Sequence, residues 1–157
     1  MPKNNIIEKK ERSSLYGKMK IAIVGSPYYR TVYKNLLKGA LNELSNHYGN
    51  KEIINVEGAL EIPTAINLIK YNFDGFIALG CVVRGETNHY DIVAENSAQA
   101  ITKLGLEGIC IGNGIITVNN YSQAIERSDP KIKNKGGDAV KALVSLLKLK
   151  QKYKVVK

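Results

Sequence analysis

The sequence predicts an α/β fold with three layers, helix–sheet–helix, around a four-stranded parallel sheet. Three observations support this prediction. Four short apolar runs have the length of strands that are buried on both faces. The segments between them place apolar residues at helical spacing. Strands that alternate with helices form a parallel sheet with right-handed crossovers, so helices cover both of its faces.

The first half of the chain contains two strands and two helices. Residues 20–25 form the first strand, and Pro27 turns the chain after it because proline disfavours helix in the preceding residue. A helix follows, which Gly49 ends and whose apolar face comprises Val32, Leu36, Leu37, Ala40, Leu41 and Leu44. Residues 52–56 form the second strand. Pro63 suits the first turn of the next helix, whose buried face comprises Ala65, Ile66, Leu68 and Ile69.

The second half of the chain repeats this alternation. Residues 76–80 form the third strand, which Gly80 interrupts. A polar loop follows, and an apolar pattern with helical spacing then predicts a helix from about Tyr90 to Leu104. The remaining elements are, in order, a fourth strand over 108–112, a short helix over 122–127 that Pro130 stops, a turn over 134–137 and a last helix with apolar residues from Val140 to Leu147.

Length and composition predict a single domain. A chain of 157 residues, 44% of them apolar, is long enough to bury a core. Residues 1–19 are polar, lysine-rich and aperiodic, which predicts a flexible N-terminal arm. The domain then covers residues 20–150, and residues 151–157 form a basic tail.

Several properties indicate a cytoplasmic protein that does not enter a membrane. No apolar run approaches the length of a membrane span, and the charged N-terminus lacks the apolar stretch of a signal peptide. Cys81 and Cys110 both belong to apolar, strand-like runs. Two buried thiols in such a chain indicate a reducing compartment and no disulfide framework.

The net charge of +9 comes from the two ends of the chain. Positions 1–20 carry six basic residues and positions 131–157 carry nine, whereas positions 21–130 carry eight basic residues against eleven acidic ones. A basic groove across the central fold, and with it specific nucleic-acid binding, is therefore not supported. The ends could still attract polyanions without specificity.

Polar and aromatic residues stand where the predicted strands end. In an open parallel sheet the carboxyl ends of the strands meet at one edge, where ligands bind, and the first N–H groups of a helix favour an anion there. An ordinary connection of solvated polar residues is the alternative. Together the side chains suit a polar ring compound plus a phosphate. They are Tyr28, Glu61, the loop 84–89, Asn113 and, further along, Arg127 and Lys135.

Several common chemistries have no motif in this sequence. No GxxxxGK[ST] phosphate loop occurs, and Gly112 and Gly114 lack the third glycine of a dinucleotide fingerprint. The chain has only two histidines, His47 and His89, and no metal cluster has workable ligand spacing. Both cysteines sit in apolar runs, so neither is predicted to be an activated nucleophile. The sequence therefore predicts no metal and no cofactor.

Five motifs follow one another along the chain: GALEIP at 58–63, ALGCVVRGETNHYD at 78–91, GNGIITV at 112–118, QAIER at 123–127 and NKG at 134–136. In order and spacing they closely resemble the lumazine synthase family, and the resemblance runs from about Lys20 to Leu147. It implies a flavodoxin-like fold, in agreement with the pattern above. It also implies the condensation of 5-amino-6-ribitylamino-uracil with 3,4-dihydroxy-2-butanone 4-phosphate to 6,7-dimethyl-8-ribityllumazine, with loss of phosphate and two waters. This is the penultimate step of riboflavin biosynthesis, and it needs neither metal nor organic cofactor.

The resemblance further implies roles for individual residues. Tyr28 stands where the family stacks an aromatic ring on the pyrimidinedione. His89 stands at the proton-transfer position, which suits an imidazole because this group titrates near neutral pH. The other substrate-binding positions are Ala59, Leu60 and Glu61 for the ribityl chain, Cys81, Val82 and Val83 for the heterocycle, Lys135 for a ring carbonyl, and Asn113, where other members carry phenylalanine. The phosphate-binding positions are Glu86, Thr87 and Arg127.

The resemblance also implies a homopentamer with active sites between adjacent subunits. Tyr28, Glu61, the 81–89 loop and Asn113 of one subunit would face Arg127 and Lys135 of the next. Pentamers of this family either stay single or close into sixty-subunit shells. Three alternatives remain open: an archaeal-type riboflavin synthase, which shares the fold and uses two lumazines, a non-catalytic flavin- or lumazine-binding protein, and a nucleic-acid binder that works through the tails.

Overall fold

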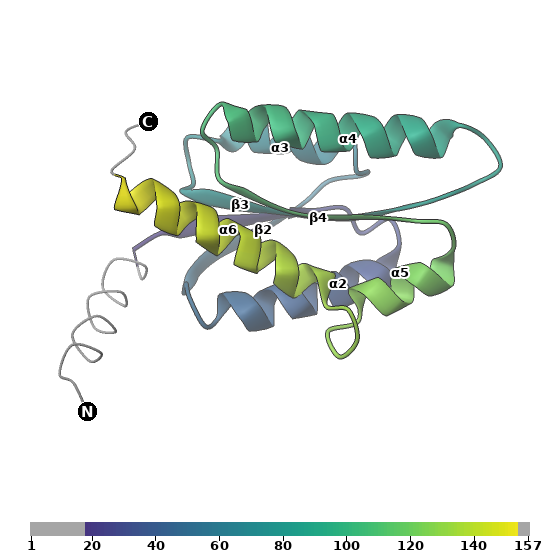
Figure 1. The fold of residues 1–157 in the computed structure, drawn as a ribbon, viewed down its shortest axis with the longest axis horizontal. Coiled ribbons are helices and arrows are strands. Elements are labelled where there is room, and N and C mark those ends of the chain that lie inside the picture. Colours follow the sequence, from purple (N-terminus) through teal and green to yellow (C-terminus); the bar gives the residue numbers. More distant parts are fainter. Residues whose placement is uncertain (1–17, 154–157) are drawn as a thin grey trace.

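Four parallel strands form one sheet in the order β2-β1-β3-β4 (Figure 1). Their bounds are Lys20–Gly25 for β1, Asn50–Asn55 for β2, Gly75–Val83 for β3 and Ile111–Val118 for β4. This is the order of the first four strands of a flavodoxin-like sheet. The structure is a computed structural model that describes residues 18–153. The predicted arm, except for its last two residues, and the end of the predicted basic tail lie outside the described residues.

Helices cover both faces of the sheet, as the sequence predicts. One face carries α2 (Arg30–Leu44), α5 (Tyr121–Ser128) and α6 (Lys135–Lys152). The other face carries α3 (Glu61–Ile69) and α4 (His89–Leu106). Figure 1 shows these two groups below and above the sheet. The predicted three-layer α/β fold is confirmed.

Strands β1 and β3 are apolar because both of their faces are buried, whereas β2, at the edge of the sheet, carries polar residues and is mostly exposed. In β1, Ile21 and Ile23 pack in the cluster beneath α2 and α6, whereas Ala22 and Val24 pack beneath α3. Strand β3 alternates in the same way. Each helix layer therefore has its own apolar core, and the sheet lies between the two cores.

Strands β3 and β4 are longer than the sequence predicts. Strand β3 does not end at Gly80 but continues to Val83, and β4 begins at Ile111 and continues to Val118. The two extensions pair with each other in register, from Gly80 opposite Ile115 to Val83 opposite Val118. Each extension supplies the hydrogen-bond partners of the other. The residues of one strand alone therefore do not indicate how far it extends.

Helix α6 begins at Lys135, so the predicted turn over 134–137 is wrong. Asn134 is the N-cap, and its side-chain oxygen accepts a hydrogen bond from the Gly137 N–H at 3.2 Å. A Cβ placed on Gly136 would overlap the Leu36 carbonyl oxygen of α2. The glycine thus stands inside the helix because α2 and α6 approach closely there, and not because the chain turns.

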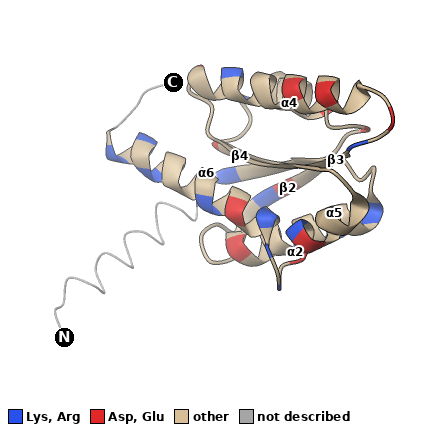
Figure 2. Ribbon diagram, turned by 45° about the vertical axis from the view of Figure 1, so that its right-hand side comes forward, with Lys and Arg blue, Asp and Glu red and all other residues tan. Residues whose placement is uncertain are grey.

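The remaining elements begin and end within a few residues of their predicted positions. No helix in the range 18–153 is both long and apolar enough to cross a membrane. Lysine residues are spread along α6 (Figure 2), which agrees with the prediction that basic charge gathers toward the C-terminal end of the chain.

Candidate active site

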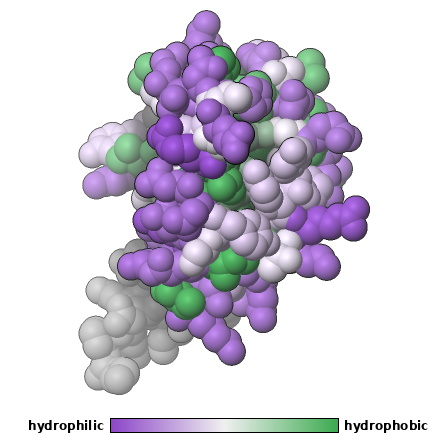
Figure 3. Space-filling model, turned by 90° about the vertical axis from the view of Figure 1, so that its right-hand side faces the viewer, coloured by the Kyte–Doolittle hydropathy of each residue, from purple (hydrophilic) through white to green (hydrophobic). Residues whose placement is uncertain are grey.

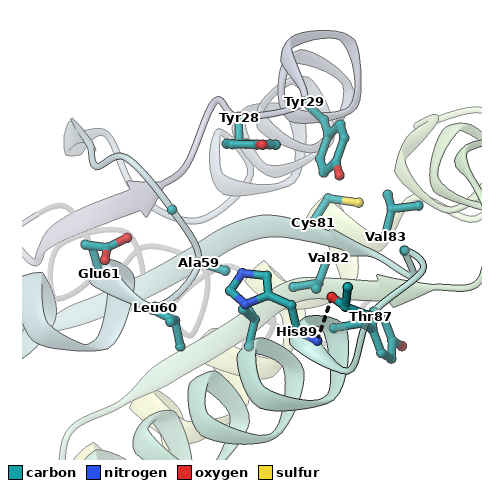
Figure 4. A pocket seen from close by; sticks show the side chains of 14 residues that line it. Tyr28, Tyr29, Ala59, Leu60, Glu61, Cys81, Val82, Val83, Thr87 and His89 are labelled. Carbon is teal, nitrogen blue, oxygen red and sulfur yellow. Dashed lines mark hydrogen bonds between the residues drawn. The ribbon is translucent and has the colours of Figure 1, made fainter.

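A cavity of about 460 Å³ opens at the carboxyl end of the strands. Four separate segments surround it: the turn after β1, the start of α3, the end of β3 and the start of α4 (Figure 4). Figure 3 shows this end of the molecule, where hydrophobic side chains lie among hydrophilic ones. Nine of the predicted site residues line the cavity: Tyr28, Ala59, Leu60, Glu61, Cys81, Val82, Val83, Thr87 and His89.

Two tyrosines form one wall of the cavity. The rings of Tyr28 and Tyr29 meet edge to face, with centroids 5.0 Å apart and planes at 72°, a favourable geometry for aromatic pairs. The Tyr28 side chain is 73% exposed, so its ring is open to a flat ligand. Burial, followed by the effects of Tyr28 and Cys81, raises the pKa of Tyr29. Its phenol therefore stays protonated and can donate a hydrogen bond.

His89 stands on the opposite side of the cavity, where α4 begins. Its imidazole ring points into the cavity toward Ala59 (Figure 4). The backbone N–H of His89 donates to the Thr87 hydroxyl oxygen at 3.3 Å, which leaves the Thr87 O–H free to donate to an anion. Glu86 does not line the cavity, and it is exposed. An anion at this turn thus meets a hydroxyl and the N–H groups of α4, and not the Glu86 carboxylate.

Glu61 places a carboxylate at the first residue of α3, where the helix dipole favours a negative charge. A Cβ on Gly58 would lie 2.8 Å from the Glu61 side-chain oxygen Oε2. The carboxylate therefore lies close to the bare backbone of Gly58, at the edge of the cavity (Figure 4). In this position it can accept hydrogen bonds from a polyhydroxy chain.

Cys81 lines the cavity without being a nucleophile. Burial raises the pKa of its thiol to about 12, so the thiol stays protonated near neutral pH. Its neighbour Val82 is buried and Val83 is partly buried. This part of β3 therefore offers a ligand an apolar surface and main-chain groups. Among the residues from 18 to 153, no three His, Cys, Asp or Glu side chains lie close enough to share a metal ion.

Asn113, Arg127 and Lys135 lie together at a second cavity, of about 360 Å³, beside β4, α5 and α6. The prediction that Asn113 shares the surface of Tyr28 and Glu61 is therefore wrong. Asn113 lies within β4 and not after it, and its side-chain oxygen accepts a hydrogen bond from the Ile115 N–H at 3.0 Å. Lys135 pairs with Asp138 at 3.1 Å. One chain thus carries two separate groups of candidate site residues.

Apart from the glycines Gly58 and Gly85, sequence reasoning missed three residues that line the first cavity: Tyr29, Tyr90 and Val93. Tyr29 could have been predicted as a site residue, because it follows Tyr28 in the turn after a strand end. Tyr90 and Val93 belong to the first turns of α4, where the apolar pattern indicated only a buried helix face. Their contribution to the cavity depends on how α4 leans over β3, and periodicity does not encode that angle.

Comparisons with known proteins give one consistent result. A family model described as 6,7-dimethyl-8-ribityllumazine synthase matches residues 18–151. The protein of that name from Jannaschia sp. (strain CCS1) is 48% identical over 137 residues, which cover 86% of this chain and 77% of the relative. The one from Zymomonas mobilis is 46% identical over 135 residues, which cover 85% and 97%. The one from Erythrobacter litoralis is 47% identical over 133 residues, which cover 83% and 95%.

Proposed function

We propose that this chain, which belongs to the 6,7-dimethyl-8-ribityllumazine synthase family, makes 6,7-dimethyl-8-ribityllumazine in the cavity between Tyr28 and His89. The substrates are 5-amino-6-ribitylamino-uracil and 3,4-dihydroxy-2-butanone 4-phosphate, and the step is the penultimate one of riboflavin biosynthesis. The observation that supports this site most is that nine implied residues, from three stretches far apart in sequence (28, 59–61 and 81–89), line one cavity.

The cavity offers a place for each part of the two substrates. The pyrimidinedione ring stacks on the exposed face of Tyr28, since a tyrosine ring provides a flat π surface. Main-chain groups of residues 81–83 meet the edge of the ring, and the Glu61 carboxylate accepts hydrogen bonds from ribityl hydroxyls. The phosphate binds at the Thr87 turn, beside the first N–H groups of α4.

The reaction needs a group that moves protons. The pyrimidine amine adds to the ketone and a water leaves, the adduct enolises and expels phosphate, and ring closure releases a second water. His89 takes and returns these protons, because its imidazole points into the cavity. Holding the two reactants together contributes about 7–11 kcal/mol to lowering the barrier. No step uses the thiol of Cys81, which stays protonated.

The purified full-length chain, mixed with both substrates, should release phosphate and form a fluorescent lumazine in equal amounts. Phosphate release and fluorescence, followed together, test the proposal. Riboflavin formed when the lumazine is the only substrate, without phosphate release, would instead identify the archaeal-type riboflavin synthase, an alternative that the names of the relatives do not favour. Stoichiometric binding without turnover would identify a non-catalytic binding protein. The cytoplasmic location stays a prediction from the sequence.

A pentamer would complete this site, because its residues fall into two groups. The turn at Thr87, which we propose binds the phosphate, lines the cavity between Tyr28 and His89 of the same chain. Arg127 and Lys135 line the second cavity instead. In our proposal the second cavity of one subunit faces the first cavity of its neighbour, so that a guanidinium fork reaches the phosphate. Such pentamers are either single or assembled into a sixty-subunit shell.

Two impaired variants should restore each other's activity when they share a pentamer. His89→Ala damages the first cavity and Arg127→Ala the second, so each homopentamer has only damaged sites. In randomly mixed pentamers, about a quarter of the contacts join an intact first cavity to an intact second cavity. Co-expression of the two variants should therefore return about a quarter of the wild-type turnover, measured on purified mixed assemblies.

The matched control pairs two changes in the same cavity. Mixed assemblies of His89→Ala with Tyr28→Ala should recover nothing, because every combination of subunits leaves the first cavity damaged. If the mixture of His89→Ala with Arg127→Ala is no more active than its two components, the shared site is refuted.

A further inference from the structure

One arginine side chain joins the start of α4 to the end of β4. Arg84 follows β3 directly, and its backbone N–H donates to the Val118 carbonyl oxygen at 2.9 Å. Its side-chain Nε donates to Asn119 Oδ1 at 3.3 Å. The guanidinium nitrogen NH1 lies 3.6 Å from Asp91 Oδ1, and the guanidinium carbon lies 4.2 Å from the centre of the Tyr90 ring. The side chain thus contacts the first turn of α4 on one side and the residue after β4 on the other.

The loop 85–88, which carries the phosphate turn, has little else to fix it. The Thr87 hydroxyl accepts from the His89 N–H, and the Asn88 carbonyl accepts from the N–H groups of Asp91 and Ile92. Over residues 18–153, no hydrogen bond of the loop itself reaches the sheet. A Cβ on Gly85 would meet no atom within 4 Å. The link between this loop and the sheet therefore depends on the residues at its two ends.

We propose that Arg84 is a positioning residue of the active site, which holds Thr87 and His89 at a fixed distance from the β3 wall of the cavity. The proposal rests on the function proposed above. A guanidinium can donate to Asn119, pair with Asp91 and stack on Tyr90 at the same time, because it is planar and has donors on several sides. Tyr90 itself lines the cavity, so the contact of Arg84 with its ring fixes the position of a residue in the cavity wall.

Lysine cannot replace this arginine if the proposal is right. A lysine retains the positive charge, but it has neither the several N–H donors of a guanidinium nor its planar surface for stacking. Arg84→Lys and Arg84→Met, in the full-length assembled enzyme, should both raise KM for the butanone phosphate and the inhibition constant of inorganic phosphate by about tenfold. KM for the pyrimidine should change less than about twofold, because Tyr28 and Glu61 are not attached to this loop.

Hydrogen exchange supplies a readout that does not require turnover. Amide protons of residues 85–91 should exchange faster in both Arg84 variants than in the wild type, whereas those of β1 should not change. The double variant Asp91→Asn with Asn119→Ala should reproduce the weaker phosphate binding. Adding Arg84→Met to it should raise the inhibition constant of phosphate little further, since these residues act as one unit. Lys103→Met removes an exposed cation from the last turn of the same helix and should leave every constant unchanged.

Two results would overturn the proposal. Arg84→Lys with wild-type constants would mean that charge alone suffices, so that Arg84 acts on the phosphate directly. Unchanged exchange of residues 85–91 in Arg84→Met would mean that the side chain does not restrain the loop. If the wild-type chain makes no lumazine, the proposed function fails, and the exchange rates alone then decide whether Arg84 restrains the loop.

Discussion

Replacing His89 with alanine is expected to slow turnover by about 10²–10⁴-fold, the usual contribution of a general acid–base. The imidazole points into the cavity, and the reaction moves a proton at each of its steps. Some turnover should remain, because the two substrates are still held together, and orientation contributes about 7–11 kcal/mol. The measurement is kcat at saturating concentrations of both substrates, with phosphate release as the signal.

The chain contains its own control for this variant. His47, the other histidine, lies 3.4 Å from Glu43 near the end of α2 and does not line the cavity. His47→Ala should leave kcat unchanged. Two outcomes would contradict the role of His89: undetectable turnover in a folded, assembled His89→Ala enzyme, or a loss smaller than about fivefold.

Gly136→Ala should be among the most destabilising single changes outside the apolar core. The added methyl group would overlap the Leu36 carbonyl oxygen, which is backbone of α2 and cannot rotate away. One of the two helices must shift, at a cost of about 1–3 kcal/mol in the free energy of unfolding. Because Gly136 follows Lys135, the shift should also displace this lysine. The expected result is a lower midpoint in urea unfolding together with weaker substrate binding.

Gly105→Ala is the matched control. Gly105 lies near the end of α4, and a Cβ placed there would meet no atom within 4 Å. Alanine is the better helix former by about 0.5–1 kcal/mol, so this variant should unfold at a higher urea concentration than the wild type. If both glycine variants shift the midpoint in the same direction, the close approach of α2 and α6 does not limit stability.

The fold could be predicted because each element has a strong local signal. Apolar runs such as Ile21–Val24 are buried on both faces, and such runs occur almost only in parallel sheets between helices. The errors concern residues whose conformation depends on a partner distant in sequence. Gly80 resembles a strand end until β4 is placed beside it. Gly136 resembles a turn until α2 is placed against it.

Most of the candidate site, like most of the fold, could be predicted, in this case from the family resemblance. Nine of its residues line one cavity, because they follow strands whose carboxyl ends meet at one edge. The placement of Asn113 failed because the prediction ended the fourth strand at Gly112, six residues before its observed end at Val118. Once β4 is extended to Val118, Asn113 becomes a strand residue beside the cavity of Arg127 and Lys135.

The hydrogen bond between the Asn113 side chain and the Ile115 N–H has an effect on solubility as well. Strand β4 forms one of the two edges of the sheet, and an unpaired edge strand offers its backbone donors to strands of other molecules. Here the amide oxygen already occupies one of these donors, in the middle of the strand. A foreign strand would first have to displace this side chain, so Asn113 hinders edge-to-edge aggregation at this strand.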